Sequence, residues 1–335
     1  MAKKSLVITS IAPSTMESLH TYAHETHQRG IDFILIGDTK SPHDFRIDHC
    51  DFWSVDRQLA SDLAFAKICP TRHYARKNIG YLVAIQNGTD EIFETDDDNY
   101  PREEFWQNHQ AIVQAKDIQD QSWLNVYNYY TDQFIWPRGL PLREIQKPLP
   151  PLENFETKNV NCPIQQGLAD ENPDVDAVFR LAFKLPLNFK KTGNIALGNQ
   201  TWCPFNSQNT YWFKEAFPLL YLPAFCSFRM TDIWRSFVAQ RIAWANGWSI
   251  LFHNATVWQE RNEHDLMKDF EDEIPGYLNN EKICAGLAAL DIRGGKENIL
   301  TDLVTCYEFL TQEGYVGQEE MPLIHAWVSD LKKIW

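Results

Sequence analysis

The order of strand and helix signals in the first hundred residues restricts the possible folds more than any other feature of this sequence. The apolar segments SLVITSI and DFILIGD have the character of buried strands, and a helical pattern follows each of them. EIFETD is a third strand of this kind. Parallel neighbours need a crossover connection, so this order predicts an α/β, Rossmann-like fold with a mostly parallel sheet flanked by helices.

Turn and cap residues define the predicted helices. Ser14 is a candidate N-cap, with Glu17 three residues later, and Gly30 is the expected stop of this first helix. Residues 54–69 are expected to form one further helix, and the next is expected to end at Gly88.

Polar residues follow each predicted strand. Ligands of open α/β sheets bind beyond the carboxyl ends of the strands. Thr9 and Ser10, Asp38, and the run Asp96–Asp98 occupy those positions. We therefore expect them on one rim of the sheet.

The three adjacent aspartates in IFETDDDNYP need a source of positive charge, because neighbouring carboxylates repel one another. A metal ion or lysine side chains could offset the repulsion between the carboxylates, or bulk water could screen it. An acidic surface turn is the simple explanation of an isolated D-x-D sequence. The preceding strand favours instead a divalent cation, Mn²⁺ or Mg²⁺, because both prefer oxygen ligands.

Composition excludes several classes of function. The net charge of −14 argues against binding to nucleic acid or to an anionic membrane surface. No run of about 18 apolar residues is present, so no transmembrane segment is expected, and the first apolar run is too short for a signal peptide. The seven cysteines are scattered without a C-x-x-C pair, which is typical of reduced thiols and a cytoplasmic protein.

The second half of the chain is less regular. The proline-rich segment 143–155 is expected to connect two halves. Residues 232–246 are predicted to form one helix that ends at Gly247, followed by the strand WSILF. The stretch 281–335 is predicted to be helical.

Five segments carry a resemblance to a known family. RKNIGYLVAIQNGTDEIFETDDDNYP resembles the nucleotide-sugar site of the STELLO glycosyltransferases and of the related reversibly glycosylated polypeptides, which are UDP-arabinopyranose mutases. The resemblance continues in order through WPRGLPL, GLADENPDVDA, PFNSQNT and MTDIWRSFVAQRIAWANG, over about residues 70–265. VWQERNEHDLMKDFEDE is more similar to the STELLO sequences.

This resemblance implies a GT-A-like fold. Residues 1–145 would form the nucleotide-sugar-binding half, residues 146–280 the acceptor half of the same domain, and residues 281–335 a C-terminal helical segment. The partners would be a nucleotide-sugar donor and a glycan or other acceptor.

It also implies the metal site. Asp96 and Asp98 of the D-x-D motif would hold the cation, and Asp96 could also face the ribose. Asp97 would point away, since alternate residues of an extended segment face opposite sides. The histidine that completes the site in relatives aligns near Gln259, and His264 is the candidate in this sequence.

Further residues would bind the nucleotide. Arg76 and Lys77 would meet the diphosphate, although a solvated helix face is the alternative for both. The remaining candidates are Thr9, Asp38, Asn78 and Arg261, and the nearby Gly80 fits either a close approach to ligand or helix packing.

Asp232 and Arg138 are the candidate catalytic residues. Asp232 would face the acceptor or the sugar, and the alternative is a helix N-cap. Arg138 matches the arginine that is self-glycosylated in the mutases, and the alternative is an ion pair with a carboxylate near the site.

Three functions follow from these residues. The first is a metal-dependent glycosyltransferase that uses a nucleotide sugar, most simply a UDP-sugar. The second is a nucleotide-sugar mutase. The third is a GT-A-like module that binds a partner without catalysis, because a fold can persist without its chemistry.

Overall fold

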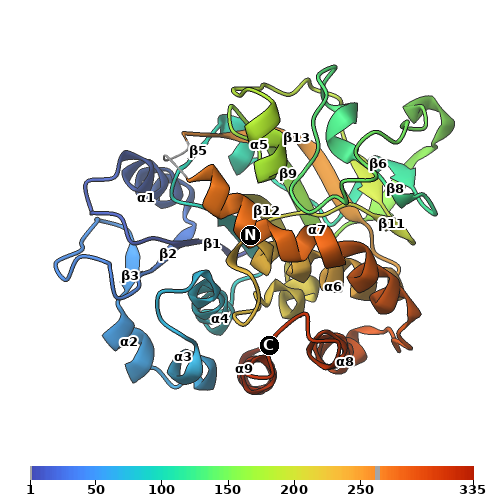
Figure 1. Cartoon of the computed structure of the whole chain (residues 1–335). Helices are drawn as coiled ribbons and strands as arrows, with labels where there is room; N and C mark the ends of the chain where they lie inside the picture. Colours follow the sequence, from blue (N-terminus) through green and yellow to red (C-terminus); the bar gives the residue numbers. More distant parts are fainter. Residues whose placement is uncertain (1, 261–264) are drawn as a thin grey trace.

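The computed structural model describes residues 2–260 and 265–335, and its central feature is one mixed sheet of eleven strands (Figure 1). The strands lie in the order β3-β2-β1-β4-β12-β9-β13-β10-β6-β8, and β5 pairs with β13. Their bounds are β1 Lys4–Thr9, β2 Asp32–Ile36, β3 Asp51–Trp53, β4 Glu91–Thr95, β5 Asn99–Pro101, β6 Ile112–Ile118, β8 Thr157–Asn161, β9 Ile164–Asp170, β10 Ile195–Leu197, β12 Asn209–Phe213 and β13 Ile250–Gln259. A separate two-stranded sheet joins β7 (Ser122–Trp123) and β11 (Thr201–Trp202).

The helices cover both faces of the sheet. Figure 1 shows α1 and α4 near the N-terminal strands, α6 to α8 toward the second half, and α9 beside α3, α4 and α8. Their bounds are α1 Glu17–Arg29, α2 Val55–Ala60, α3 Ala64–Ile68, α4 Lys77–Gln86, α5 Ala177–Ala182, α6 Thr231–Ala245, α7 Leu266–Ala289, α8 Ile299–Gln312 and α9 Glu320–Ile334. The α/β class, the sheet flanked by helices and the helical C-terminal part are confirmed.

The N-terminal strands β1 to β4 pair in parallel, as predicted. Alternate residues of β1 face two different cores: Leu6 packs in a cluster with α1, and Val7 packs in a cluster with α4. Gly80 of α4 lies directly against the sheet. A Cβ at this position would come within 2.6 Å of Val7 Cγ1, so Gly80 serves helix packing.

The second half departs from parallel pairing. β12 lies antiparallel to both β4 and β9, while β13 runs parallel to β9 and antiparallel to β10. One continuous sheet therefore joins the two predicted halves, and the segment 143–155 runs outside it.

Three helix predictions need correction. The helix predicted from Ser14 begins at Glu17, with Met16 at the N-cap and no side-chain cap, although Gly30 ends it in a left-handed conformation as expected. The single helix predicted over 54–69 is two short helices, α2 and α3, separated at residues 61–63. The predicted boundary at residue 281 falls inside α7, so the C-terminal helical part begins at Leu266.

The C-terminal helices are fastened to the N-terminal half by buried carboxylates. Asp330 of α9 accepts hydrogen bonds from the amides of Ala64 (3.0 Å) and Phe65 (2.8 Å), which satisfies the first turn of α3. Glu320 accepts from the amides of Ala224 (3.0 Å) and Phe225 (2.7 Å). These contacts connect α9 to α3 and to the segment that leads into α6.

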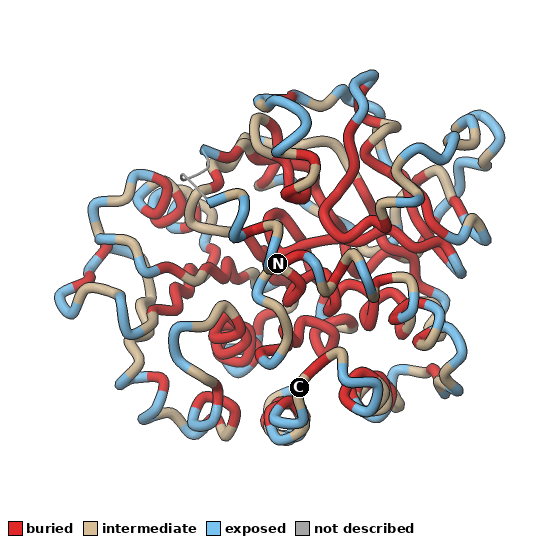
Figure 2. The backbone as a smooth tube through the Cα atoms, in the orientation of Figure 1, coloured by how far each residue is buried: buried red, intermediate tan, exposed pale blue. Residues whose placement is uncertain are grey.

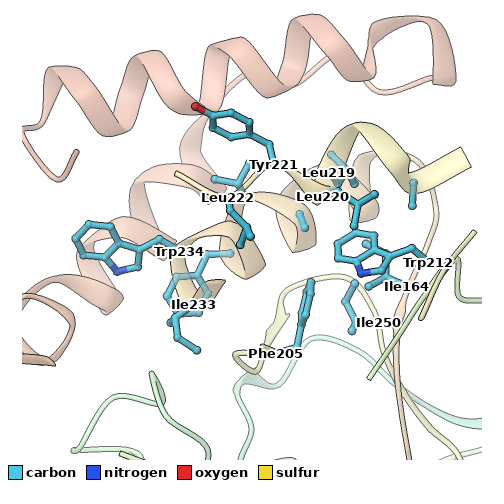
Figure 3. Close-up of a cluster of buried hydrophobic side chains, with 14 of the residues drawn as sticks. Ile164, Phe205, Trp212, Leu219, Leu220, Tyr221, Leu222, Ile233, Trp234 and Ile250 are labelled. Atoms are coloured by element: carbon cyan, nitrogen blue, oxygen red, sulfur yellow. The ribbon is translucent and has the colours of Figure 1, made fainter. Parts of the chain in front are cut away.

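The main core lies between the sheet and helices α4 and α6 to α9. Figure 2 shows this interior as nearly continuous buried backbone. Figure 3 shows Trp212 beside Ile164 and Leu220, with Phe205 and Ile250 close by. Within the described residues, no helix has the length and apolar character needed to cross a membrane.

A buried ion pair crosses this core. Arg235 Nη1 of α6 donates to Glu94 Oε1 of β4 at 2.7 Å, and both side chains are at most 1% exposed. Trp212 Nε1 donates to Glu94 Oε2 at 2.9 Å, and Tyr81 donates its hydroxyl to Glu94. Glu94 therefore joins α4, β12 and α6 at one point.

Replacing Glu94 with Gln should lower the free energy of unfolding by about 3–5 kcal/mol, because it leaves the Arg235 charge buried without its carboxylate. The double variant Glu94→Gln/Arg235→Met should recover most of this loss, since it removes both charges. Urea denaturation of the parent, the two single variants and the double variant measures the effect. Strictly additive losses would contradict this account of the pair.

Candidate functional site

The polar residues that follow β1, β2 and β4 meet at one cavity of about 530 Å³. The cavity lies beyond the carboxyl ends of these parallel strands, as the fold predicts. Seven of the predicted site residues line it: Thr9, Asp38, Arg76, Asp96, Asp98, Arg138 and Asp232. Lys77 and Asn78 do not line it, and Arg261 and His264 lie outside the described residues.

Lys77 supplies part of the positive charge that the aspartate cluster requires, through Asp96. Its side chain is fully buried, and its ammonium lies 3.0 Å from Asp96 Oδ1. The same ammonium donates to the carbonyl oxygen of Thr95 (2.7 Å) and to the hydroxyl of Tyr74 (2.8 Å). Lys77 is therefore neither on a solvated helix face nor at the cavity wall; it supports Asp96 from behind.

Asp97 faces a different part of the chain from its neighbours. Ser10 donates its hydroxyl to Asp97 Oδ2 at 2.5 Å, and Ser18 donates to the Asp97 carbonyl oxygen. Burial raises the pKa of the Asp97 carboxyl, while the Ser10 hydrogen bond opposes that rise. The side chain thus connects β4 to the turn after β1, although it also borders the cavity.

Asp98 receives a side-chain hydrogen bond from a neutral amide, and its pKa is raised. Burial, reinforced by the charge of Asp96, raises the pKa of Asp98 to about 7. Gln259 Nε2, at the end of β13, donates to Asp98 Oδ1 at 3.0 Å. The residue that aligns near the relatives' histidine therefore touches the predicted metal ligand directly.

The free oxygens of the cluster suit a divalent cation. Among the described residues, Oδ2 of Asp96 and Oδ2 of Asp98 have no hydrogen-bond partner, and both residues line the cavity. Within the same residues, no group of three His, Cys, Asp or Glu side chains converges on a point. Two carboxylates with phosphate oxygens are a usual environment for Mg²⁺, so the donor set fits a cation shared with a phosphorylated ligand.

Arg76 and Asn78 have structural partners. Arg76 is 1% exposed, and its guanidinium donates to Gln58 Oε1 (2.9 Å) and to the carbonyl oxygen of Cys69 (3.0 Å). Asn78 exchanges two hydrogen bonds with the backbone of Leu222. Asn78 does not line the cavity, and a helix-to-loop contact uses its amide, so nucleotide binding by Asn78 stays a prediction.

Asp38 is partly engaged by backbone. Its Oδ2 accepts from the amide of His73 at 3.1 Å, and its Oδ1 accepts from the amide of Thr39 at 2.6 Å. This holds the loop before α4 against the end of β2. Thr9 lies opposite at the end of β1, half-buried in the cavity wall.

Arg138 lies between two carboxylates on the other side of the cavity. It is bidentate to Asp174, with both distances 2.8 Å, and bidentate to Asp232, at 3.0 and 2.9 Å. Arg138 also donates to the carbonyl oxygen of Arg229, which occupies its fifth N–H group. The structure thus has the ion-pair arrangement named as the alternative for Arg138, and no guanidinium nitrogen is free to attack a sugar.

Asp232 is a poor general base. Burial opposes its ionisation, but the Arg138 guanidinium outweighs burial and lowers the pKa of Asp232 to about 2. Its Oδ2 also accepts from the amide of Ser207 at 3.2 Å. Asp232 is in the first turn of α6 and is not its N-cap, which is Met230.

Two residues that sequence reasoning missed connect these clusters. The hydroxyls of Tyr74 and Ser207 lie 2.6 Å apart; Tyr74 also donates to Asp96 Oδ1 at 2.7 Å, and Ser207 Oγ lies 3.3 Å from Asp232 Oδ2. Tyr74 lies within the helix predicted to end at Gly88, in the short 3-10 turn that precedes α4 in the structure, and Ser207 lies in the PFNSQNT segment, but neither residue type indicates such a role.

The mouth of the cavity carries cations that were also missed. Lys40 and Arg72 are exposed and line the cavity, and neither has an ion-pair partner among the described residues. Phe228 lies beside them with 55% of its surface exposed, and its ring packs edge-on against Tyr74 at 6.3 Å. The cavity lining therefore combines the aspartate cluster, the exposed cations Lys40 and Arg72, and the exposed aromatic ring of Phe228.

Comparison with known proteins relates the chain to one family. A family model described as STELLO glycosyltransferases matches residues 229–335. Two Arabidopsis thaliana proteins, Probable glycosyltransferase STELLO2 and Probable glycosyltransferase STELLO1, are each 26% identical over 325 residues. The match covers 90% of this chain and 42% and 41% of theirs, so the chain spans about two-fifths of the length of these relatives.

Solved structures with a related shape are more distant in sequence. Glucosyl-3-phosphoglycerate synthase from Mycobacterium tuberculosis gives a TM-score of 0.43 at 12% identity, covering 84% of this chain and 81% of that one. A mycobacterial protein gives a TM-score of 0.44 at 12% identity over 84% and 75%. In sequence, the chain is similar to the STELLO glycosyltransferases, which supports that part of the resemblance noted from the motifs.

Proposed function

We propose that this protein is a metal-dependent glycosyltransferase that uses a nucleotide sugar, most simply a UDP-sugar. One observation carries the proposal: the Oδ2 atoms of Asp96 and Asp98, which have no hydrogen-bond partner within residues 2–260 and 265–335, belong to residues that line a cavity of about 530 Å³ at the ends of parallel strands. The sequence similarity to STELLO glycosyltransferases supports the same reaction class.

Asp96 and Asp98 would hold Mn²⁺ or Mg²⁺, and Lys77 fixes the orientation of Asp96. When bound, the cation supplies Lewis-acid stabilisation of the charge that grows on the departing diphosphate. Lys40 and Arg72 stand at the mouth as cations available to the same phosphates. Thr9 and Asp38 border the part of the cavity where the nucleoside would lie.

The Arg138 cluster has a positioning role in this proposal. Because Asp232 is held ionised by Arg138 and Ser207, it offers a fixed acceptor for hydroxyl groups of the sugar or of the acceptor. Its pKa of about 2 makes it ineffective in taking a proton at neutral pH. The acceptor would approach from the side of Phe228, the exposed aromatic lip.

UDP with Mn²⁺ should raise the melting temperature, and EDTA should abolish the rise. Ligand at about 100 times its dissociation constant adds roughly 2.7 kcal/mol to the free energy of unfolding. A thermal-shift series with UDP, GDP, ADP and CDP, with and without Mn²⁺, makes the measurement. If none of these nucleotides shifts the melting temperature, the proposed donor site is wrong.

Asp98→Asn should weaken Mn²⁺ binding and abolish metal-dependent nucleotide binding, because it removes a charge beside the cation. Asp97→Asn is the matched control: the amide oxygen can still accept from Ser10, so Mn²⁺ affinity should remain nearly that of the parent. Calorimetric Mn²⁺ titration compares the two variants. Equal affinity in Asp98→Asn and the parent would remove the metal from the mechanism.

The same variant should change how stability depends on pH. The folded pKa of Asp98, about 7, lies above its ordinary value of 3.8, so the folded state holds this proton more tightly than the unfolded chain does. Ionisation of Asp98 therefore costs stability as the pH rises from about 4 to about 7. In EDTA, Asp98→Asn should be more stable than the parent at pH 8, with little difference at pH 4. Equal curves at both pH values would contradict the raised pKa.

Arg138 separates this proposal from the mutase alternative. With all five N–H groups hydrogen-bonded, Arg138 should gain no sugar mass when the protein is incubated with a UDP-sugar that binds. Peptide mass spectrometry after incubation tests this. A pentose or hexose on the Arg138 peptide would favour the mutase.

A further inference from the structure

A second cavity of about 640 Å³ lies apart from the first and shares no lining residue with it. The segment 104–114, the edge strand β8, the start of β9 and residues 253–256 of β13 form its walls. Its volume is in the range of sites that enclose small ligands.

An irregularity of β13 builds one wall of this second cavity. His253 pairs with Gly167 and Val257 with Ala169. Between these two pairs, β13 advances by four residues while β9 advances by two. The extra residues form a bulge, and bulges re-aim side chains at the cost of ladder hydrogen bonds. The bulge is anchored, because Asn254 Oδ1 accepts from the amides of Thr192 (2.9 Å) and Gly193 (3.0 Å).

The wall is polar but has no net charge. Eight of its seventeen described lining residues carry carboxamides, and those of Gln107, Gln114 and Asn159 are exposed. Among the described residues that line it, the only Asp, Glu, Lys or Arg side chains are Glu104 and Lys191, and these two pair at 3.2 Å. The number of charged side chains distinguishes the two cavities: six aspartates and five lysine or arginine residues line the first, and only this one ion pair is found among the described residues that line the second.

Two histidines of the lining have pKa values below the ordinary value for the residue. Burial lowers the pKa of His253 to about 3 and also lowers that of His109. His109 Nδ1 donates to Gln165 Oε1 at 3.0 Å, and the Gln165 amide is oriented by its own bond to the Gln110 carbonyl oxygen. His253 Nδ1 donates to the Asn254 carbonyl oxygen at 3.0 Å, so Nε2 of the neutral ring is an acceptor. That atom has no partner among the described residues.

We propose that the second cavity binds a neutral carbohydrate, recognised through hydroxyl groups by the carboxamides and by His253 Nε2. Carboxamides both donate and accept, which matches the hydroxyl groups of a sugar. A phosphorylated ligand would need unpaired cations, and the lining lacks them. The proposal does not depend on the nucleotide site.

The test uses maltotriose, cellotriose and mannotriose as neutral probes and trigalacturonate as the acidic probe, followed by ligand-observed NMR and calorimetry. At least one neutral trisaccharide should bind in EDTA, without nucleotide, and trigalacturonate should bind more weakly. Excess UDP with Mn²⁺ should not displace the trisaccharide, because the two cavities are separate.

Two variants locate the binding. Asn159→Trp adds bulk at an exposed position of β8 without disturbing a core, and His253→Phe keeps a ring but removes the acceptor nitrogen. Each should weaken binding by about tenfold or more, and His24→Phe, on an exposed face of α1, should not change it. Melting curves confirm that each variant is folded.

The proposal is overturned if no neutral trisaccharide binds, if trigalacturonate binds as tightly, or if both cavity variants bind like the parent. Displacement by UDP with Mn²⁺ would place the sugar in the first cavity and also overturn it. A missing UDP shift alone would affect only the nucleotide site, so the two proposals fail independently.

Discussion

The buried ammonium of Lys77 holds the candidate site together. It joins the first turn of α4 to the end of β4 through Thr95 and Asp96, and it contacts Tyr74 as well. A buried charge is tolerated only when it is paired and hydrogen-bonded, and Lys77 meets both conditions. One ammonium cannot balance three carboxylates, however. Within the described residues, the Oδ2 atoms of Asp96 and Asp98 are left without a partner at the cavity, where the proposed cation would complete the balance.

The local parts of the fold were predictable because they depend on patterns within a few residues. The apolar runs gave β1, β2 and β4, and Gly30, Gly88 and Gly247 end their helices with the positive φ that glycine tolerates. The meeting of Thr9, Asp38 and Asp96 at one rim of the sheet followed from the rule that ligands of open α/β sheets bind beyond the carboxyl ends of the strands. Asp97 does bond to Ser10, but it lines the same cavity as Asp96 and Asp98, and residues 97–98 form a turn rather than the extended chain that alternation of side chains requires.

Contacts between distant segments were not predictable in the same way. Arg138 finds Asp174 and Asp232 at separations of 36 and 94 residues, and Ser207 meets Tyr74 across 133. Nothing in a local pattern distinguishes these polar residues from others on a surface. Asn78 shows the same difficulty, since its amide bonds the backbone of Leu222, which lies 144 residues away in the sequence. The antiparallel pairing of β12 likewise depends on tertiary packing.

The cap that Asp330 places on α3 has a consequence for the timing of folding. The carboxylate lies 266 residues after Ala64, so the first turn of α3 remains without this partner while the intervening chain is made. At roughly 5–20 residues per second, that interval lasts about 15–50 s. During it, the surface of α3 and α4 that α9 later covers is exposed to solvent. Nascent chains of this protein should therefore be clients of chaperones that hold apolar surface, until α9 has left the ribosome.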